Sequence, residues 1–140
     1  MNLQEFSRLN LERCTSPDGF NHPLSAWSLS DWMVATMGEL GEAANVLKKL
    51  NRARDGIPGN SETVEQLEQM FADELADAFT YMDLLAQAAG VDLPDAIVAK
   101  FNRVSAKIGY HKVLDSDVLY GQSSRRSRHR QTAGSNLEPE

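Results

Sequence analysis

Two pairs of acidic residues have the types and the spacing that could bind a divalent cation. Glu39 and Glu42 stand three residues apart, and so do Glu74 and Asp77. On a helix, residues at i and i+3 lie on the same side, so each pair would present two carboxylates together. Carboxylate oxygens are ligands that Mg²⁺ and Mn²⁺ prefer in proteins. The spacing therefore indicates a metal site between two facing helices.

Hydrophobic periodicity places these carboxylates toward the apolar side of each helix. At about 100° of rotation per residue, the first helix has an apolar arc formed by Trp32, Ala35, Leu40, Ala43, Val46, Leu47 and Leu50. The second helix has an arc formed by Leu67, Met70, Phe71, Leu75, Ala78, Tyr81, Met82 and Leu85. Glu39 and Glu74 fall inside these arcs, whereas Glu42 and Asp77 fall at their edges. Because an unpaired buried carboxylate is costly, a cation should compensate. An interhelical ion-pair arrangement is the alternative, and a di-iron bundle is disfavoured because neither helix contains a histidine.

Several lysines could contact a phosphorylated ligand. Lys48 and Lys49 follow the first acidic pair and could capture phosphate, or could form the solvated end of a helix. In the last helix, Lys100, Arg103 and Lys107 share one flank. This row could neutralise phosphate oxygens, or could be a rim of long side chains around an apolar stripe.

The loop before the first acidic helix carries aromatic side chains, which often stack on nucleobases. His22 and Trp27 lie in this loop and are candidates for contacting a base or a sugar. Trp32 is a third candidate, although its position on the apolar arc also favours a place in the core.

Length and composition indicate a single globular protein without disulfide bonds. A chain of 140 residues with one cysteine, Cys14, can bury a core but cannot form an internal disulfide framework. The net charge of −6 argues against a nucleic-acid groove, so no stable nucleic-acid partner is expected. No apolar run suggests a membrane span and the N-terminus lacks a signal-peptide core, so a cytoplasmic protein is expected.

The pattern of helix signals predicts an all-α fold. The expected architecture is an antiparallel bundle of about four helices over residues 1–114, followed by a Ser/Arg-rich tail over residues 115–140. The expected helices cover residues 3–14, Ser28 or Ser30 to about Arg54, about 62–89 with a cap at Asn60 or Ser61, and Asp92 to about Ile108.

These motifs resemble those of the MazG-like all-α nucleoside triphosphate pyrophosphohydrolases. Related groups include dimeric dUTPases, dCTP pyrophosphatases and phosphoribosyl-ATP pyrophosphohydrolase. The matching stretch runs from about Phe20 to Tyr110. Its best parts are Asn21-His22-Pro23 with Trp27 to Trp32, Gly38 to Asn45 followed by Lys48-Lys49, and Asp73 to Ala78.

The resemblance implies hydrolysis of a (d)NTP to the (d)NMP and pyrophosphate, with Mg²⁺ or Mn²⁺ as cofactor. It implies that Glu42, Glu74 and Asp77 ligate metal. Glu39 would ligate metal and also orient or deprotonate the attacking water. A lysine would hold the leaving pyrophosphate, and Lys100 and Asn102 are carried over more weakly from the last helix.

The resemblance also implies a homodimer or a dimer of dimers, which would complete the helical bundle. Two features depart from the family pattern. Gly38 stands where the family often has a further glutamate, and the separation between Glu42 and Glu74 is slightly long, with room for the extra residues at 55–60. The alternative from another class is a non-catalytic helical bundle that binds a nucleotide or dimerises as a regulator. Among enzymes, a histidine-biosynthetic or housecleaning role is the runner-up.

Overall fold

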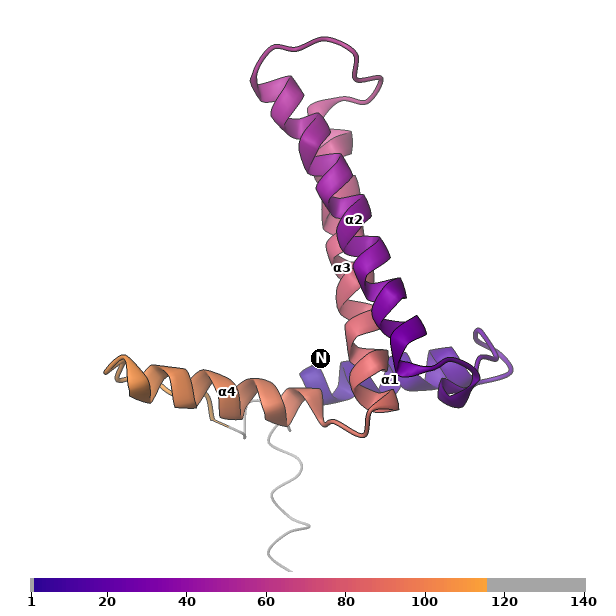
Figure 1. Ribbon diagram of the computed structural model, residues 1–140, viewed down its shortest axis with the longest axis vertical. Helices are drawn as coiled ribbons and strands as arrows, with labels where there is room; N and C mark the ends of the chain where they lie inside the picture. Colours follow the sequence, from indigo (N-terminus) through magenta and orange to yellow (C-terminus); the bar gives the residue numbers. More distant parts are fainter. Residues whose placement is uncertain (1, 116–140) are drawn as a thin grey trace, which may run out of the picture. The chain divides into compact units, whose positions relative to one another are not determined.

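The computed structural model describes residues 2–115, and all the regular structure in this range is helical (Figure 1). This confirms the predicted all-α class. The elements are α1 (Leu3–Thr15), the short 3₁₀ helix η1 (Leu24–Ala26), α2 (Leu29–Arg54), α3 (Val64–Ala88) and α4 (Leu93–Lys107). The predicted tail lies outside the described residues from position 116 onward.

Local capping fixes where α2 and α3 begin. Of the two serines predicted to cap α2, the structure selects Ser28, whose hydroxyl accepts from the backbone N–H of Asp31 while the Asp31 carboxylate accepts from the Ser28 N–H. The predicted caps of α3, Asn60 and Ser61, are wrong. Thr63 is the cap, because Gln66 three residues later completes the same reciprocal pair of hydrogen bonds.

The caps of α4 and the end of α3 follow the sequence prediction closely. Asp92 caps α4 by accepting from the Asp95 N–H at 3.0 Å, with Pro94 in the first turn. After α3, Gly90 adopts a φ of +70°, a left-handed conformation that glycine takes without steric cost.

The chain divides into two compact units. One is Asn10–Val91, and the other, within the described residues, joins residues 2–9 to residues 92–115. In the first unit, α2 and α3 run antiparallel side by side as a long hairpin (Figure 1). In the second unit, the Gln4 side chain donates to the Asp92 carboxylate at 3.2 Å. The helical packing agrees with a helical bundle, and completion of that bundle by dimerisation stays a prediction.

The core of the hairpin unit is centred on Trp32, which is 1% exposed. Trp32 packs with Cys14 and Leu84, and its indole N–H donates to the carbonyl of Leu24 at 3.1 Å. Replacing a buried tryptophan of this kind by alanine typically costs about 3–5 kcal/mol. Trp32 therefore fixes the start of α2 against the end of α3.

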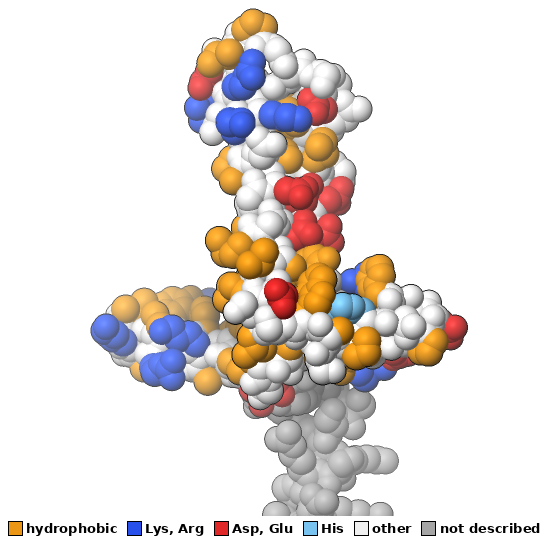
Figure 2. Space-filling view, turned by 45° about the vertical axis from the view of Figure 1, so that its right-hand side comes forward, with side chains coloured by type: hydrophobic (Ala, Val, Ile, Leu, Met, Phe, Trp, Pro, Cys, Tyr) orange, Lys and Arg blue, Asp and Glu red, His pale blue; other side chains and the backbone are white. Residues whose placement is uncertain are grey.

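The two flanks of the α2–α3 hairpin differ in chemistry. Figure 2 shows orange side chains gathered on one side of the hairpin and a group of acidic side chains on the other. By the helical period, six exposed apolar residues share this side, here called the apolar flank. They are Met33, Met37, Leu40 and Leu47 of α2 with Leu75 and Met82 of α3, each between 37% and 57% exposed. Within residues 2–115, no helix is both long enough and apolar enough to cross a membrane.

Candidate metal centre

Three of the four predicted carboxylates come together on the acidic flank of the hairpin. Glu39 projects from the middle of α2, and Glu74 and Asp77 project from the middle of α3. One carboxylate oxygen from each residue lies within 4.8 Å of the others. This group, here called the carboxylate cluster, forms because α2 and α3 run antiparallel with both acidic pairs at the same level.

Glu42 lies one helical turn beyond Glu39 and is exposed, outside the carboxylate cluster. Its charge still acts on that cluster, since Glu42 is one of the residues that raise the pKa of Glu39. The structure therefore places Glu42 as a peripheral acidic residue and not as one of the three convergent ones.

The electrostatics of the cluster centre on Glu39, which is half-buried. Burial is the main reason that the pKa of Glu39 is raised. The negative charges of Asp77, Glu42 and Glu74 raise the pKa further, as does a hydrogen bond with Glu74. A divalent cation would offset this repulsion. The all-oxygen set of donors fits Mg²⁺ or Mn²⁺, because both prefer carboxylate ligands.

An aromatic pocket lies beside the carboxylate cluster, with a volume of about 340 Å³. Its walls include the side chains of Phe20, His22, Trp27, Trp32 and Tyr81. Asp77 also lines this pocket. The same residue thus belongs to both the cluster and the pocket, so a ligand in the pocket would lie next to Asp77.

The structure brings together all three aromatic residues that were predicted to contact a base or a sugar. The ring of His22 meets Trp27 edge-on with centroids 4.8 Å apart, and Trp27 lies 4.8 Å from Trp32. The loop is held in place because the His22 backbone N–H donates to the carbonyl of Cys14 at 2.8 Å, while the Cys14 thiol donates to the carbonyl of His22. Burial raises the pKa of that thiol, which keeps it protonated as a donor.

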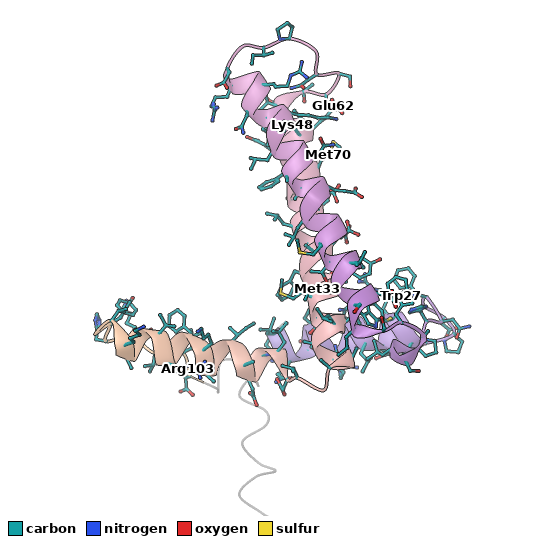
Figure 3. All side chains as sticks on the ribbon, viewed as in Figure 1. Trp27, Met33, Lys48, Glu62, Met70 and Arg103 are labelled. Carbon is teal, nitrogen blue, oxygen red and sulfur yellow. The ribbon has the colours of Figure 1, made fainter. Side chains whose placement is uncertain are left out.

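Two of the predicted phosphate-binding lysines lie away from the pocket. Figure 3 labels Lys48 and Glu62 at one end of the hairpin and Trp27 at the other. Lys49 forms an ion pair with Glu62 at 2.5 Å, and its hydrogen bond lowers the pKa of Glu62 to about 2. Within one chain, this end of the hairpin does not meet the carboxylate cluster.

The remaining predicted residues, Lys100, Asn102 and Lys107, lie on α4 in the other compact unit. The side chain of Asn102 hydrogen-bonds to the backbone of Leu114. It donates to the carbonyl of Leu114 at 2.8 Å and accepts from the Leu114 N–H at 2.7 Å, which holds the segment after α4. The roles of Lys100 and Lys107 in binding phosphate, and of Asn102 in contacting the base or sugar, stay predictions.

No family model, curated protein or solved structure matches this chain. The carboxylate cluster can hold a divalent cation, and the aromatic pocket can hold a flat ring. Together they suit a ligand that has a planar part next to an anionic part.

Sequence reasoning missed two polar residues that line the pocket from α1, Asn10 and Arg13. Asn10 is 4% exposed, although a polar residue in a short amphipathic helix is ordinarily assigned to solvent. The spacing of three between Asn10 and Arg13 shows that they share a side of α1. It does not show that this side faces the aromatic loop.

Proposed function

We propose that this protein is a divalent-metal-dependent nucleoside triphosphate pyrophosphohydrolase, which converts a (d)NTP and water to a (d)NMP and pyrophosphate. The observation that supports this most is the shared position of Asp77, which lines the aromatic pocket and belongs to the carboxylate cluster. A nucleotide joins a flat base to a polyanion. With the base in the pocket, its phosphates would reach the acidic group, where carboxylates repel them unless a cation intervenes.

The acidic residues would have different roles in this reaction. Bound Mg²⁺ or Mn²⁺ would supply neutralisation of phosphate charge and Lewis acidity. Glu39, Glu74 and Asp77 would hold the cation, with Glu42 assisting from the next turn of α2. Glu39 would orient the attacking water and accept its proton. Glu39 suits this role because it is half-buried within the carboxylate cluster.

In this reaction the water oxygen forms a bond to the α-phosphorus. The bond from that phosphorus to the bridging oxygen breaks, and pyrophosphate leaves. His22, Trp27 and Trp32 would hold the base while this occurs. Of the predicted cations, Lys49 is engaged by Glu62, so Lys48, Lys100 and Lys107 are the better candidates for holding the leaving group.

We also propose a homo-oligomer, either a dimer or a dimer of dimers. The support is the apolar flank, whose six side chains are each more than a third exposed. Contiguous exposed apolar surface of this kind marks interaction sites more often than free surface. A second copy of the hairpin offers an equally apolar face, which suits the self-complementary contact of a two-fold dimer.

The direct test is a pyrophosphate-release assay with Mg²⁺ and each of the common nucleoside triphosphates. Glu74→Gln and Asp77→Asn should each lower release by roughly 100-fold or more, since each removes a charge that holds the cation. Glu68→Gln is the matched control, because Glu68 lies on α3 outside the carboxylate cluster. Unchanged release in both cluster variants would refute the site, and orthophosphate as the sole primary product would refute the reaction class.

A non-catalytic protein that binds a nucleotide or dimerises as a regulator is the second candidate. This candidate is favoured by Gly38, which stands where the MazG-like family often has a further glutamate, so the acidic side of the hairpin has one carboxylate fewer than that pattern. Binding of nucleotide and Mg²⁺ without turnover of any triphosphate would select this candidate.

A further inference from the structure

We propose that Arg13 selects the base in the aromatic pocket by donating hydrogen bonds to a ring carbonyl, so that guanine, uracil, thymine and cytosine are accepted over adenine. This inference rests on the proposed function, because it names which nucleotides the same site would take. It is carried by the position of Arg13, the network behind it, and an unpartnered nitrogen in the pocket wall.

Arg13 is held in place although it is exposed. Its Nη2 donates to the Oδ1 of Asn10 at 3.2 Å, and its guanidinium carbon lies 5.7 Å from the centroid of the Phe20 ring. A guanidinium carries five N–H donors and accepts nothing. Asn10 takes one donor, so others are available to a ligand in the pocket that Arg13 lines.

The support behind Arg13 is a buried polar network. The Asn10 amide donates to the carbonyl of Thr80 at 3.0 Å and to the Asp83 carboxylate at 2.9 Å. Asp83 is 2% exposed and also accepts from the side chain of Gln87 at 2.8 Å. Because both donors of the Asn10 amide are engaged, its oxygen faces Arg13 and cannot flip away without breaking buried hydrogen bonds.

A second observation concerns His22, which also lines the pocket. The Nε2 of His22 is buried and has no hydrogen-bond partner among residues 2–115. The His22 ring makes edge-on contacts with Trp27 and Trp32, with centroids 4.8 Å and 5.5 Å away. A buried polar atom without a partner is costly. A ligand edge that carries both donors and acceptors would satisfy Nε2 in either tautomer of the imidazole.

The chemistry of Arg13 discriminates among the bases. Guanine presents O6 beside N7, two acceptors that match a guanidinium fork. Uracil, thymine and cytosine each carry at least one ring carbonyl. Adenine has none, and next to its N7 it presents an amino group that would meet the donors of Arg13. The aromatic walls accept any of these rings, so the discrimination depends on Arg13.

The chain provides its own probe for this pocket. Trp27 and Trp32 are its two tryptophans, and both line the pocket. Intrinsic fluorescence of the full chain therefore reports occupancy without any turnover. Titration with dGMP, dUMP, TMP, dCMP and dAMP should give affinity for dAMP at least about tenfold weaker than for the tightest of the others, the range expected for a bidentate contact.

The test variant is Arg13→Lys, which keeps the positive charge but loses the planar guanidinium that can donate two parallel hydrogen bonds. In this variant, the affinity for the tightest-binding of the other monophosphates should exceed the affinity for dAMP by about twofold or less. Arg54→Lys is the matched control, since Arg54 is paired with Asp55 after α2 and should leave the preference unchanged. Because Arg13 is exposed, both variants should retain the helical circular dichroism of the parent.

The outcomes separate this inference from the proposed function. No fluorescence response to any monophosphate, equal affinity for all five, or a preference that survives Arg13→Lys would each overturn the role of Arg13. A preference that depends on Arg13 in a protein that releases no pyrophosphate would uphold the pocket and overturn the hydrolysis.

Discussion

Glu39 of α2 and Asp77 of α3 bring carboxylate oxygens within 4.8 Å of one another across the hairpin. Burial raises the pKa of Glu39, and the like charges at this distance raise it further because they disfavour ionisation. When the pKa of a carboxyl group is higher in the folded state than in the unfolded state, the folded protein loses stability as the pH rises through the interval between the two pKa values. At neutral pH the ionisation of Glu39 therefore opposes folding, unless a cation binds.

Mg²⁺ should stabilise the protein through this cluster. We expect the melting temperature to rise with MgCl₂, by an amount equivalent to about 2.7 kcal/mol at a concentration 100 times the dissociation constant. Asp77→Asn should raise the melting temperature in EDTA, because it removes repulsion, and should remove most of the Mg²⁺ response. Differential scanning calorimetry measures both effects, and NaCl at the same ionic strength as the MgCl₂ is the control. Equal Mg²⁺ responses in the parent and in Asp77→Asn would contradict the metal site.

Gly38 offers a gain-of-charge test. A Cβ at Gly38 or at Gly41 would meet nothing within 4 Å, so a glutamate fits at either place. Both replacements should stabilise α2 by roughly 0.5 kcal/mol, the difference in helix propensity. Gly38 lies one turn before Glu42 on the acidic flank, whereas Gly41 lies on the side of α2 away from α3. Gly38→Glu should therefore tighten Mg²⁺ binding severalfold in a calorimetric titration while Gly41→Glu should not, and identical affinities would show that Gly38 does not face the site.

The features that sequence predicted well are those set by local patterns. The course of α2 to Arg54 and the side of the helix that carries Glu39 follow from capping and from a period of 3.6 residues. The start of α3 was predicted wrongly because several residues there can cap a helix. The reciprocal partner Gln66, which singles out Thr63, was the overlooked signal.

The features that sequence could not supply depend on tertiary position. Arg13 and Asn10 line the pocket because α1 ends beside the aromatic loop, and nothing in their own segment encodes that neighbour. Lys49 was predicted to bind phosphate, yet its partner is Glu62. That pairing depends on how residues 55–63 turn back. Asn60 fixes this turn by donating to the carbonyl of Lys49 at 2.8 Å.

The Lys49–Glu62 ion pair should make stability depend on pH in the acidic range. Because the pKa of Glu62 falls to about 2 in the folded protein, the contribution of the pair is fully present above about pH 5 and is lost as the pH falls toward 2. Lys49→Met should lower the melting temperature slightly at pH 7, as expected for a pair that solvent still reaches, and the deficit should shrink at lower pH. Lys48→Met is the neighbouring control. A deficit that stays constant from pH 7 to pH 3 would mean that Lys49 acts through packing.

The apolar flank should be where copies of this chain meet. Leu40→Lys and Leu75→Lys each place a charge on this flank, one from α2 and one from α3, and burying an unpaired lysine at an interface is costly. We expect each to weaken self-association at least about tenfold in analytical ultracentrifugation. Val34→Lys is the matched control, because Val34 is 70% exposed on α2 but lies about 120° around the helix from Leu40. If the parent sediments as a monomer at high concentration, or if Val34→Lys dissociates it as readily, the apolar flank is not the interface.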